Sequence, residues 1–210
     1  MIRTAILPAL ALLSACGTST PEAANEVAAN ASVEPAPAME NGIEVGNVAE
    51  TPAAQASTAP LLNLAPGGLT LIDPTNGRAR QLTFGTERAM VMRGAEAALG
   101  APDESGRSGE CGEGAMDFAK FDGLRLWFQG GKLVGWFLDG AQPKLTTGTG
   151  AGIGSTRAQV ADGLAISDVP ESSLGREFTT ESGSFSGLLD GPGDAAKVTT
   201  LWSGHACIFR

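Results

Sequence analysis

Residues 203–207, close to the end of the chain, carry the side chains best suited to covalent chemistry. His205 is the single histidine, and a histidine base beside a serine or cysteine nucleophile is a common basis of covalent catalysis. Ser203 and His205 are two residues apart on an expected strand, which places their side chains about 7 Å apart, too far for a direct hydrogen bond. We therefore expect no catalytic residue and interpret His205 as a surface or edge residue.

Two further segments have the composition of ligand-binding loops without their spacing. The glycine-rich segment 148–156 lacks the lysine of a phosphate-binding loop, and no parallel βαβ unit surrounds it, so we interpret it as a flexible hinge. Four acidic residues surround Cys111 in a Gly- and Ser-rich loop, but their spacing is not that of a calcium loop: Asp103, Glu104, Glu110 and Glu113. One histidine and a pair of cysteines do not favour zinc. The sequence predicts neither a metal nor a cofactor.

The N-terminal residues have the pattern of a secretion signal. Arg3 provides a positive charge, and the apolar run 5–13 follows, interrupted only by Pro8. A membrane-spanning helix needs roughly 20 apolar residues, so this run is too short to remain a span. Residues 13–16, Leu-Ser-Ala-Cys, resemble the lipobox of bacterial lipoproteins, in which the cysteine is lipidated and becomes the new N-terminus. The alternative is that Cys16 is an ordinary thiol after a cleaved signal.

The lipobox resemblance implies where the protein resides. Acyl chains on Cys16 would hold it on a lipid bilayer, because about two chains already give stable anchoring. Gly17 follows the cysteine, and in envelope lipoproteins the absence of aspartate at this position favours the outer membrane. We therefore expect a periplasm-facing outer-membrane lipoprotein whose signal peptide is residues 1–15.

Residues 16–60 are expected to form the lipidated cysteine and a disordered linker. Ala, Pro, Glu, Asn, Ser and Thr dominate, aromatic residues are absent, and no base accompanies the acids Glu22, Glu26, Glu34, Glu40, Glu44 and Glu50. Such a segment cannot bury enough apolar surface to offset the entropy lost on ordering. An Ala-rich helix over 21–32 is the alternative, although its alanines form no apolar stripe.

The charges argue against nucleic acid as a partner. The chain carries a net charge of −9 at pH 7, from 23 acidic and 14 basic residues. Without the six linker glutamates and Arg3, 17 acidic and 13 basic residues remain in the last 150 residues. They are interspersed and form no basic block, so we expect one domain with no basic surface for nucleic acid or membrane.

The cysteine count points to one disulfide. With Cys16 lipidated, Cys111 and Cys207 form an even remainder in a secreted chain, which suggests that they are bonded. The bond would join the middle of the domain to its last strand and stabilise it by roughly 4 to 5 kcal/mol through chain entropy. Two free, buried thiols are the alternative.

An internal repeat predicts the architecture. A hairpin is expected from 69–72 and 78–84 around an Asn-Gly turn. A helix should follow, with Thr86 as its N-cap, and residues 153–160 repeat the helix-start pattern of 84–91. Strands are expected behind the two helices at 116–121, 124–128, 132–138, 176–180, 184–189 and 197–203.

These expectations define a fold class and its boundaries. We predict an α+β domain of two tandem helix-plus-antiparallel-meander repeats, preceded by a β-hairpin and the disordered linker. The hairpin and the first repeat take residues 61–145, and the hinge and the second repeat take 146–210.

The repeat unit, over 84–202, resembles the fold of β-lactamase-inhibitor proteins and of small outer-membrane assembly lipoproteins. In the inhibitor family tandem sheets form a concave binding face, which implies that aromatic side chains could line such a face here: Trp127, Trp136, Trp202, Phe128 and Phe137. Most of them also suit a core, because alternate strand positions must fill the space beneath the helices.

The expected function is non-enzymatic. We expect a lipid-anchored lipoprotein that binds or inhibits another protein of the cell envelope through a sheet face or edge. Two alternatives remain open. One is a small envelope hydrolase that uses His205, and the other is a module that binds a small molecule or peptidoglycan in a pocket lined by Trp127, Trp136 or Trp202.

Overall fold

The computed structural model describes residues 58–140 and 145–209. The chain divides into two units, Met1–Thr51 and Pro52–Arg210, and the described residues all belong to the second. The expected signal peptide, Cys16 and most of the expected linker lie outside the described residues. In the described part, neither helix is long and apolar enough to cross a membrane.

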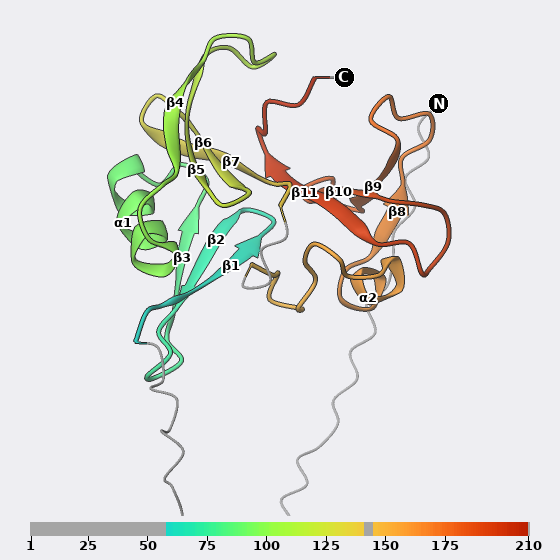
Figure 1. Ribbon diagram of the computed structural model, residues 1–210, viewed down its shortest axis with the longest axis horizontal. Helices are drawn as coiled ribbons and strands as arrows, with labels where there is room; N and C mark the ends of the chain where they lie inside the picture. Colours follow the sequence, from blue (N-terminus) through green and yellow to red (C-terminus); the bar gives the residue numbers. More distant parts are fainter. Residues whose placement is uncertain (1–57, 141–144, 210) are drawn as a thin grey trace, which may run out of the picture. The chain divides into compact units, whose positions relative to one another are not determined.

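The described chain begins with a small antiparallel sheet followed by a helix (Figure 1). The small sheet contains β1 (Leu61–Ala65), β2 (Gly68–Ile72) and β3 (Ala79–Thr83), and the helix is α1 (Arg88–Leu99). The predicted hairpin corresponds to β2 and β3, which Asn76 and Gly77 help to connect; Gly77 has a φ of 69°. Thr86 is not the N-cap of α1, because the helix starts one residue later, after Glu87, and has no side-chain cap.

A large antiparallel sheet forms the rest of the domain, in the order β4-β5-β6-β7-β11-β10-β9-β8. Helix α2 (Arg157–Gly163) begins with a capping box, in which Thr156 and Gln159 bond reciprocally at 3.2 and 2.8 Å. The strands are β4 (Glu104–Ser108), β5 (Met116–Phe121), β6 (Leu124–Gln129), β7 (Lys132–Leu138), β8 (Ile166–Asp168), β9 (Arg176–Thr180), β10 (Ser186–Leu189) and β11 (Val198–Gly204).

The predicted α+β class of helix-plus-meander repeats is wrong. Within residues 58–140 and 145–209 the chain is mostly β, with 11 strands in two antiparallel sheets and helices of only 12 and 7 residues. Strands β1, β4 and β8 were not predicted. The last two are edge strands with mostly exposed residues, so they lack the apolar alternation that marks a strand. The second helix ends at Gly163, and Leu164 is extended with a φ of −142° and leads the chain into β8.

The segment predicted as a flexible hinge is packed against the small sheet. Leu64 donates its backbone N–H to the carbonyl of Thr146, at 2.8 Å. Thr147 Oγ1 accepts from the backbone N–H of Ala151, at 3.1 Å, and Ala151 itself is buried. These contacts hold residues 146–151 against the domain, so the glycines in this stretch do not make it a free linker.

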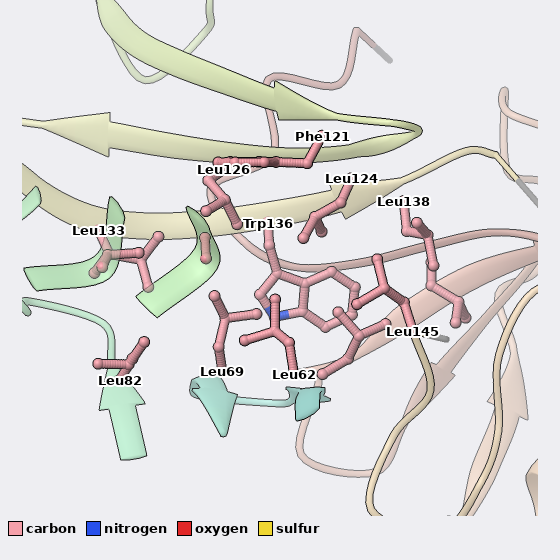
Figure 2. Close-up of a cluster of buried hydrophobic side chains, with 14 of the residues drawn as sticks. Leu62, Leu69, Leu82, Phe121, Leu124, Leu126, Leu133, Trp136, Leu138 and Leu145 are labelled. Carbon is pink, nitrogen blue, oxygen red and sulfur yellow. The ribbon is translucent and has the colours of Figure 1, made fainter. Parts of the chain in front are cut away.

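The core lies between the small sheet and one face of the large sheet, with Trp136 at its centre. Figure 2 shows the Trp136 ring between Leu62 and Leu69 of the small sheet and Leu124 of β6. Trp136 is completely buried, and its Nε1–H donates to the carbonyl of Ala65 at 2.9 Å. This hydrogen bond satisfies the single polar atom of the side chain. The indole therefore joins the two sheets without leaving a buried donor unpaired, which would be costly.

Replacing Trp136 tests this contact between the two sheets. Trp136→Phe removes the hydrogen bond to Ala65, leaves that carbonyl without its partner and opens a cavity, so we expect a loss of about 2 to 4 kcal/mol of unfolding free energy. Denaturant unfolding followed by circular dichroism measures it. Met90→Ala, at a position 40% exposed on α1, is the control and should change stability by less than about 0.5 kcal/mol. Equal effects of the two substitutions would contradict the assigned role.

Candidate functional site

The large sheet has apolar side chains on both faces, but the two faces are covered to different extents. The inner face packs on the small sheet and on both helices through a cluster that includes Trp136 and Phe178. The outer face carries a second cluster built on Met116, Trp127 and Trp202. Around it lie side chains that are only partly buried: Phe118, Val134, Phe137, Leu174, Leu188 and Ile208. The outer face is therefore the side of the sheet on which apolar groups stay partly accessible.

The aromatic residues of the predicted binding face divide between these two faces. Phe128 and Trp136 belong to the inner core and are completely buried. Trp127, Trp202 and Phe137 belong to the outer face; the two tryptophans are 3% and 6% exposed, and Phe137 is half-buried. The division follows from strand geometry, because neighbours such as Phe128 and Trp127 must point to opposite faces. The five residues do not form one surface.

A continuous row of cross-strand partners crosses the outer face from edge to edge. In antiparallel sheets directly opposed residues share a face, so the register places one residue of each strand in the row. From β4 to β8 the row is Glu104, Lys120, Arg125, Phe137, Trp202, Ser186, Thr179 and Ser167. It is charged at the β4 end, aromatic in the middle and hydroxylic at the β8 end. Phe137 and Trp202 stack at its centre, with ring centroids 6.4 Å apart.

Arg125 lies among aromatic rings beside this centre. Its guanidinium carbon is 5.5 Å from the Phe118 ring centroid and 5.6 Å from that of Trp127, and these two rings are 5.7 Å apart. Cation–π contacts of this kind stabilise a partly desolvated arginine. Within the described part of the chain, Arg125 Nε and Trp127 Nε1 are buried without a hydrogen-bond acceptor. The outer face thus holds an arginine and two unsatisfied donors next to its aromatic centre.

The C-terminal segment (205–209) covers part of the outer face. After Gly204, His205 donates its backbone N–H to the carbonyl of Val134 at 3.0 Å. It lies so close to Gly135 that a Cβ there would come 2.2 Å from the carbonyl oxygen of His205. Cys207 is bonded to Cys111, which confirms the predicted disulfide. One covalent bond therefore fastens this segment to the loop before β5.

A groove of about 180 Å³ remains between the C-terminal segment and the strands. Phe137, Trp202 and Leu188 line it from the sheet, Ile208 lines it from the C-terminal segment, and Arg125 is also part of its wall. Most of the lining is therefore apolar, with one cation in contact with it. Such a site can hold an apolar side chain and pair an adjacent carboxylate or carbonyl with the arginine.

The residues considered for catalysis are not brought together. Ser203 is 1% exposed, and its Oγ lies against the carbonyl oxygens of Pro66 and Ser184. His205 is exposed and lines a different groove, of about 210 Å³, with Glu113. Among the residues that the structure describes, no group of three or more His, Cys, Asp or Glu side chains could hold a metal ion.

Sequence reasoning missed three participants in the outer face, namely Phe118, Arg125 and Leu188. A signal was present for the arginine, because Arg125 alternates with Leu124 and Leu126, which fill the inner core. Period-two alternation therefore assigns it to the opposite face. The partial cover by the C-terminal segment could not be found in this way, since it depends on where Gly204 turns the chain.

Removing the disulfide tests how the C-terminal segment is held. The bond joins residues 96 positions apart, so its reduction should lower the unfolding free energy by roughly 4 to 5 kcal/mol by the chain-entropy estimate. Denaturant unfolding with and without a phosphine reductant measures this loss. A Cys111→Ser/Cys207→Ser double variant should match the reduced protein and not respond to reductant. If reduction left the wild-type midpoint unchanged, the bond would not be what fastens the segment.

Comparisons with known proteins give no match: neither a protein family, nor a curated protein, nor a solved structure matches the chain. The resemblance to bacterial lipoproteins at residues 13–16 stays a prediction. What the protein does must therefore be inferred from the chemistry of its own surfaces, and the outer face offers an aromatic groove with one arginine.

Proposed function

We propose that the protein is a lipid-anchored lipoprotein of the bacterial envelope that binds another envelope protein through the groove on the outer face. The observation that carries this proposal is the combination of stacked Phe137 and Trp202 with Arg125 at the groove. Aromatic residues and arginine are the types most enriched at the energetic centres of protein interfaces. The partner inserts an apolar side chain between Leu188 and Ile208.

The size of the groove favours a protein over a small molecule as the occupant. Small-molecule sites commonly occupy about 300 to 1,000 Å³, whereas this groove has about 180 Å³, which suits one large side chain. Phe209, which follows the lining residue Ile208 in the chain, is 66% exposed and adds an accessible apolar side chain to the C-terminal segment. A partner surface with one protruding side chain can cover both.

The compartment is supported by two independent features. The Cys111–Cys207 disulfide is typical of proteins in oxidising compartments. The lipobox-like residues 13–16 supply the expected anchor, with acyl chains on Cys16 in the outer membrane and the domain facing the periplasm. The segment 16–60 then separates the domain from the bilayer.

Site-specific crosslinking tests the outer groove. A photo-reactive phenylalanine derivative at Leu188 should give a discrete adduct with one envelope protein in intact cells, whereas the same residue at exposed Met90 should not. Thr200→Trp fills the groove from β11, whose residue Thr200 lines it, and should abolish the Leu188 adduct by steric exclusion. Thr83→Trp, the same change on an exposed strand position of the small sheet, is the matched control. An adduct that survives Thr200→Trp would contradict the proposed site.

Lipidation is tested separately. Cells fed an alkyne fatty acid should label the wild-type protein, and Cys16→Ala should lose the label and move to the soluble envelope fraction, because no acyl chain remains to hold it. Retention of Cys16→Ala in the membrane fraction would rule out the anchor without affecting the crosslinking result.

A further inference from the structure

A second and larger groove, of about 660 Å³, lies between helix α1 and the β2–β3 hairpin. Figure 1 shows the helix and this hairpin, and Gly94 brings them into close contact. A Cβ at Gly94 would approach Leu71 Cδ1 to 2.5 Å, so helix and strand touch there. Pro60, Ala79 and Ala97 complete an apolar lining. The groove is separate from the outer face and shares no lining residue with the groove beside Phe137.

Three arginines line this groove, and no residue that the structure describes pairs with them. Arg78 and Arg80 come from the hairpin and Arg93 from α1, and all three are exposed. In the parts of the chain that are described, none of their guanidinium groups forms an ion pair or a hydrogen bond. By contrast, Arg88 and Arg157 each lie within 4 Å of an aspartate, at 3.8 and 3.1 Å.

The one acid in the lining does not neutralise these arginines by contact. Asp73 holds the hairpin turn: its carboxylate accepts from Thr75 Oγ1 at 2.6 Å, from the Thr75 backbone N–H at 2.8 Å and from Asn76 Nδ2 at 2.9 Å. The hydrogen bond from the Thr75 side chain is the largest cause that lowers the pKa of Asp73 below its usual value. Its oxygens are therefore engaged within the turn, and three cations against one anion leave the lining with a net charge of +2.

We propose that this groove binds an extended acidic peptide segment of a partner protein. Arginine pairs with carboxylates in a planar, two-point geometry, which makes unpaired arginines around an apolar floor a receptor for acidic residues. The arginines come from two separate elements, so carboxylates spaced along a peptide match them better than a single anionic head group does. The apolar side chains between those carboxylates rest on Leu71 and Ala97.

The charge of the whole protein makes this groove selective. The last 150 residues carry 17 acidic and 13 basic residues, so their net charge of −4 does not attract an acidic segment to the rest of the domain. A local positive groove on an acidic protein steers such a segment to one place and weakens binding elsewhere. The association therefore falls with rising salt concentration, because partly exposed charges are screened over a Debye length of about 10 Å at 0.1 M salt.

A labelled peptide of alternating glutamate and valine tests the proposal with the full chain. Fluorescence anisotropy should show saturable binding, and the same peptide with glutamine for glutamate should bind at least about tenfold more weakly. Arg80→Glu and Arg93→Glu should each weaken binding of the acidic peptide by about tenfold or more, because a like charge then faces a carboxylate. Arg176→Glu, which makes the same charge change on an exposed residue of β9, should leave the affinity within about twofold.

Further variants separate the groove from a general attraction between charges. Ala97→Trp adds bulk at an exposed lining position and should block the peptide while retaining the net charge and the circular dichroism spectrum. Thr200→Trp in the other groove should leave peptide binding unchanged. The proposal would be overturned if Ala97→Trp bound the peptide with wild-type affinity, or if Arg176→Glu lost as much affinity as the groove variants. It would also be overturned if decanoate displaced the peptide at the peptide's own concentration, which would indicate a fatty-acid site instead.

Discussion

The domain depends on one joint, the contact between the small sheet and the inner face of the large sheet. Trp136 fills this contact and bonds to the backbone of Ala65, so one residue of β7 fixes the position of β1. The leucines around it seal the space from both sides. Both helices of the described chain also pack on this side, through Val91 of α1 and Val160 of α2.

Because the joint uses both helices and the small sheet, little chain remains for the opposite side. Strand alternation nevertheless places every second residue there, and several of these residues are large and apolar. The C-terminal segment covers part of them, and the disulfide at Cys207 keeps it in place against thermal opening. The accessible groove beside Phe137 is thus a consequence of how the inner face is packed.

The sequence predicts local elements well and their arrangement poorly. Strands β5 and β7 lie where they were expected, because glycine-containing turns and apolar alternation mark their ends. Strands β4 and β8 were missed, since exposed edges need no apolar pattern. In the pairs Trp127-Phe128 and Trp136-Phe137, strand alternation indicates that the two side chains point to opposite faces of the large sheet. Which of those faces the small sheet covers is decided by contacts between residues far apart in the sequence. The sequence therefore identifies which aromatic residues are important for the sheet, but it does not show which of them share a surface.

The order of strands has a consequence for when the domain can fold. Strand β11 follows all the other described strands in sequence, yet it lies between β7 and β10 and joins the two halves of the large sheet. N-terminal segments normally begin to fold while the rest of a chain is still being made. Here the strand that unites the sheet, and Cys207 behind it, emerge after every other strand of that sheet. The two halves of the large sheet therefore cannot pair through β11 until all of their other strands have been made.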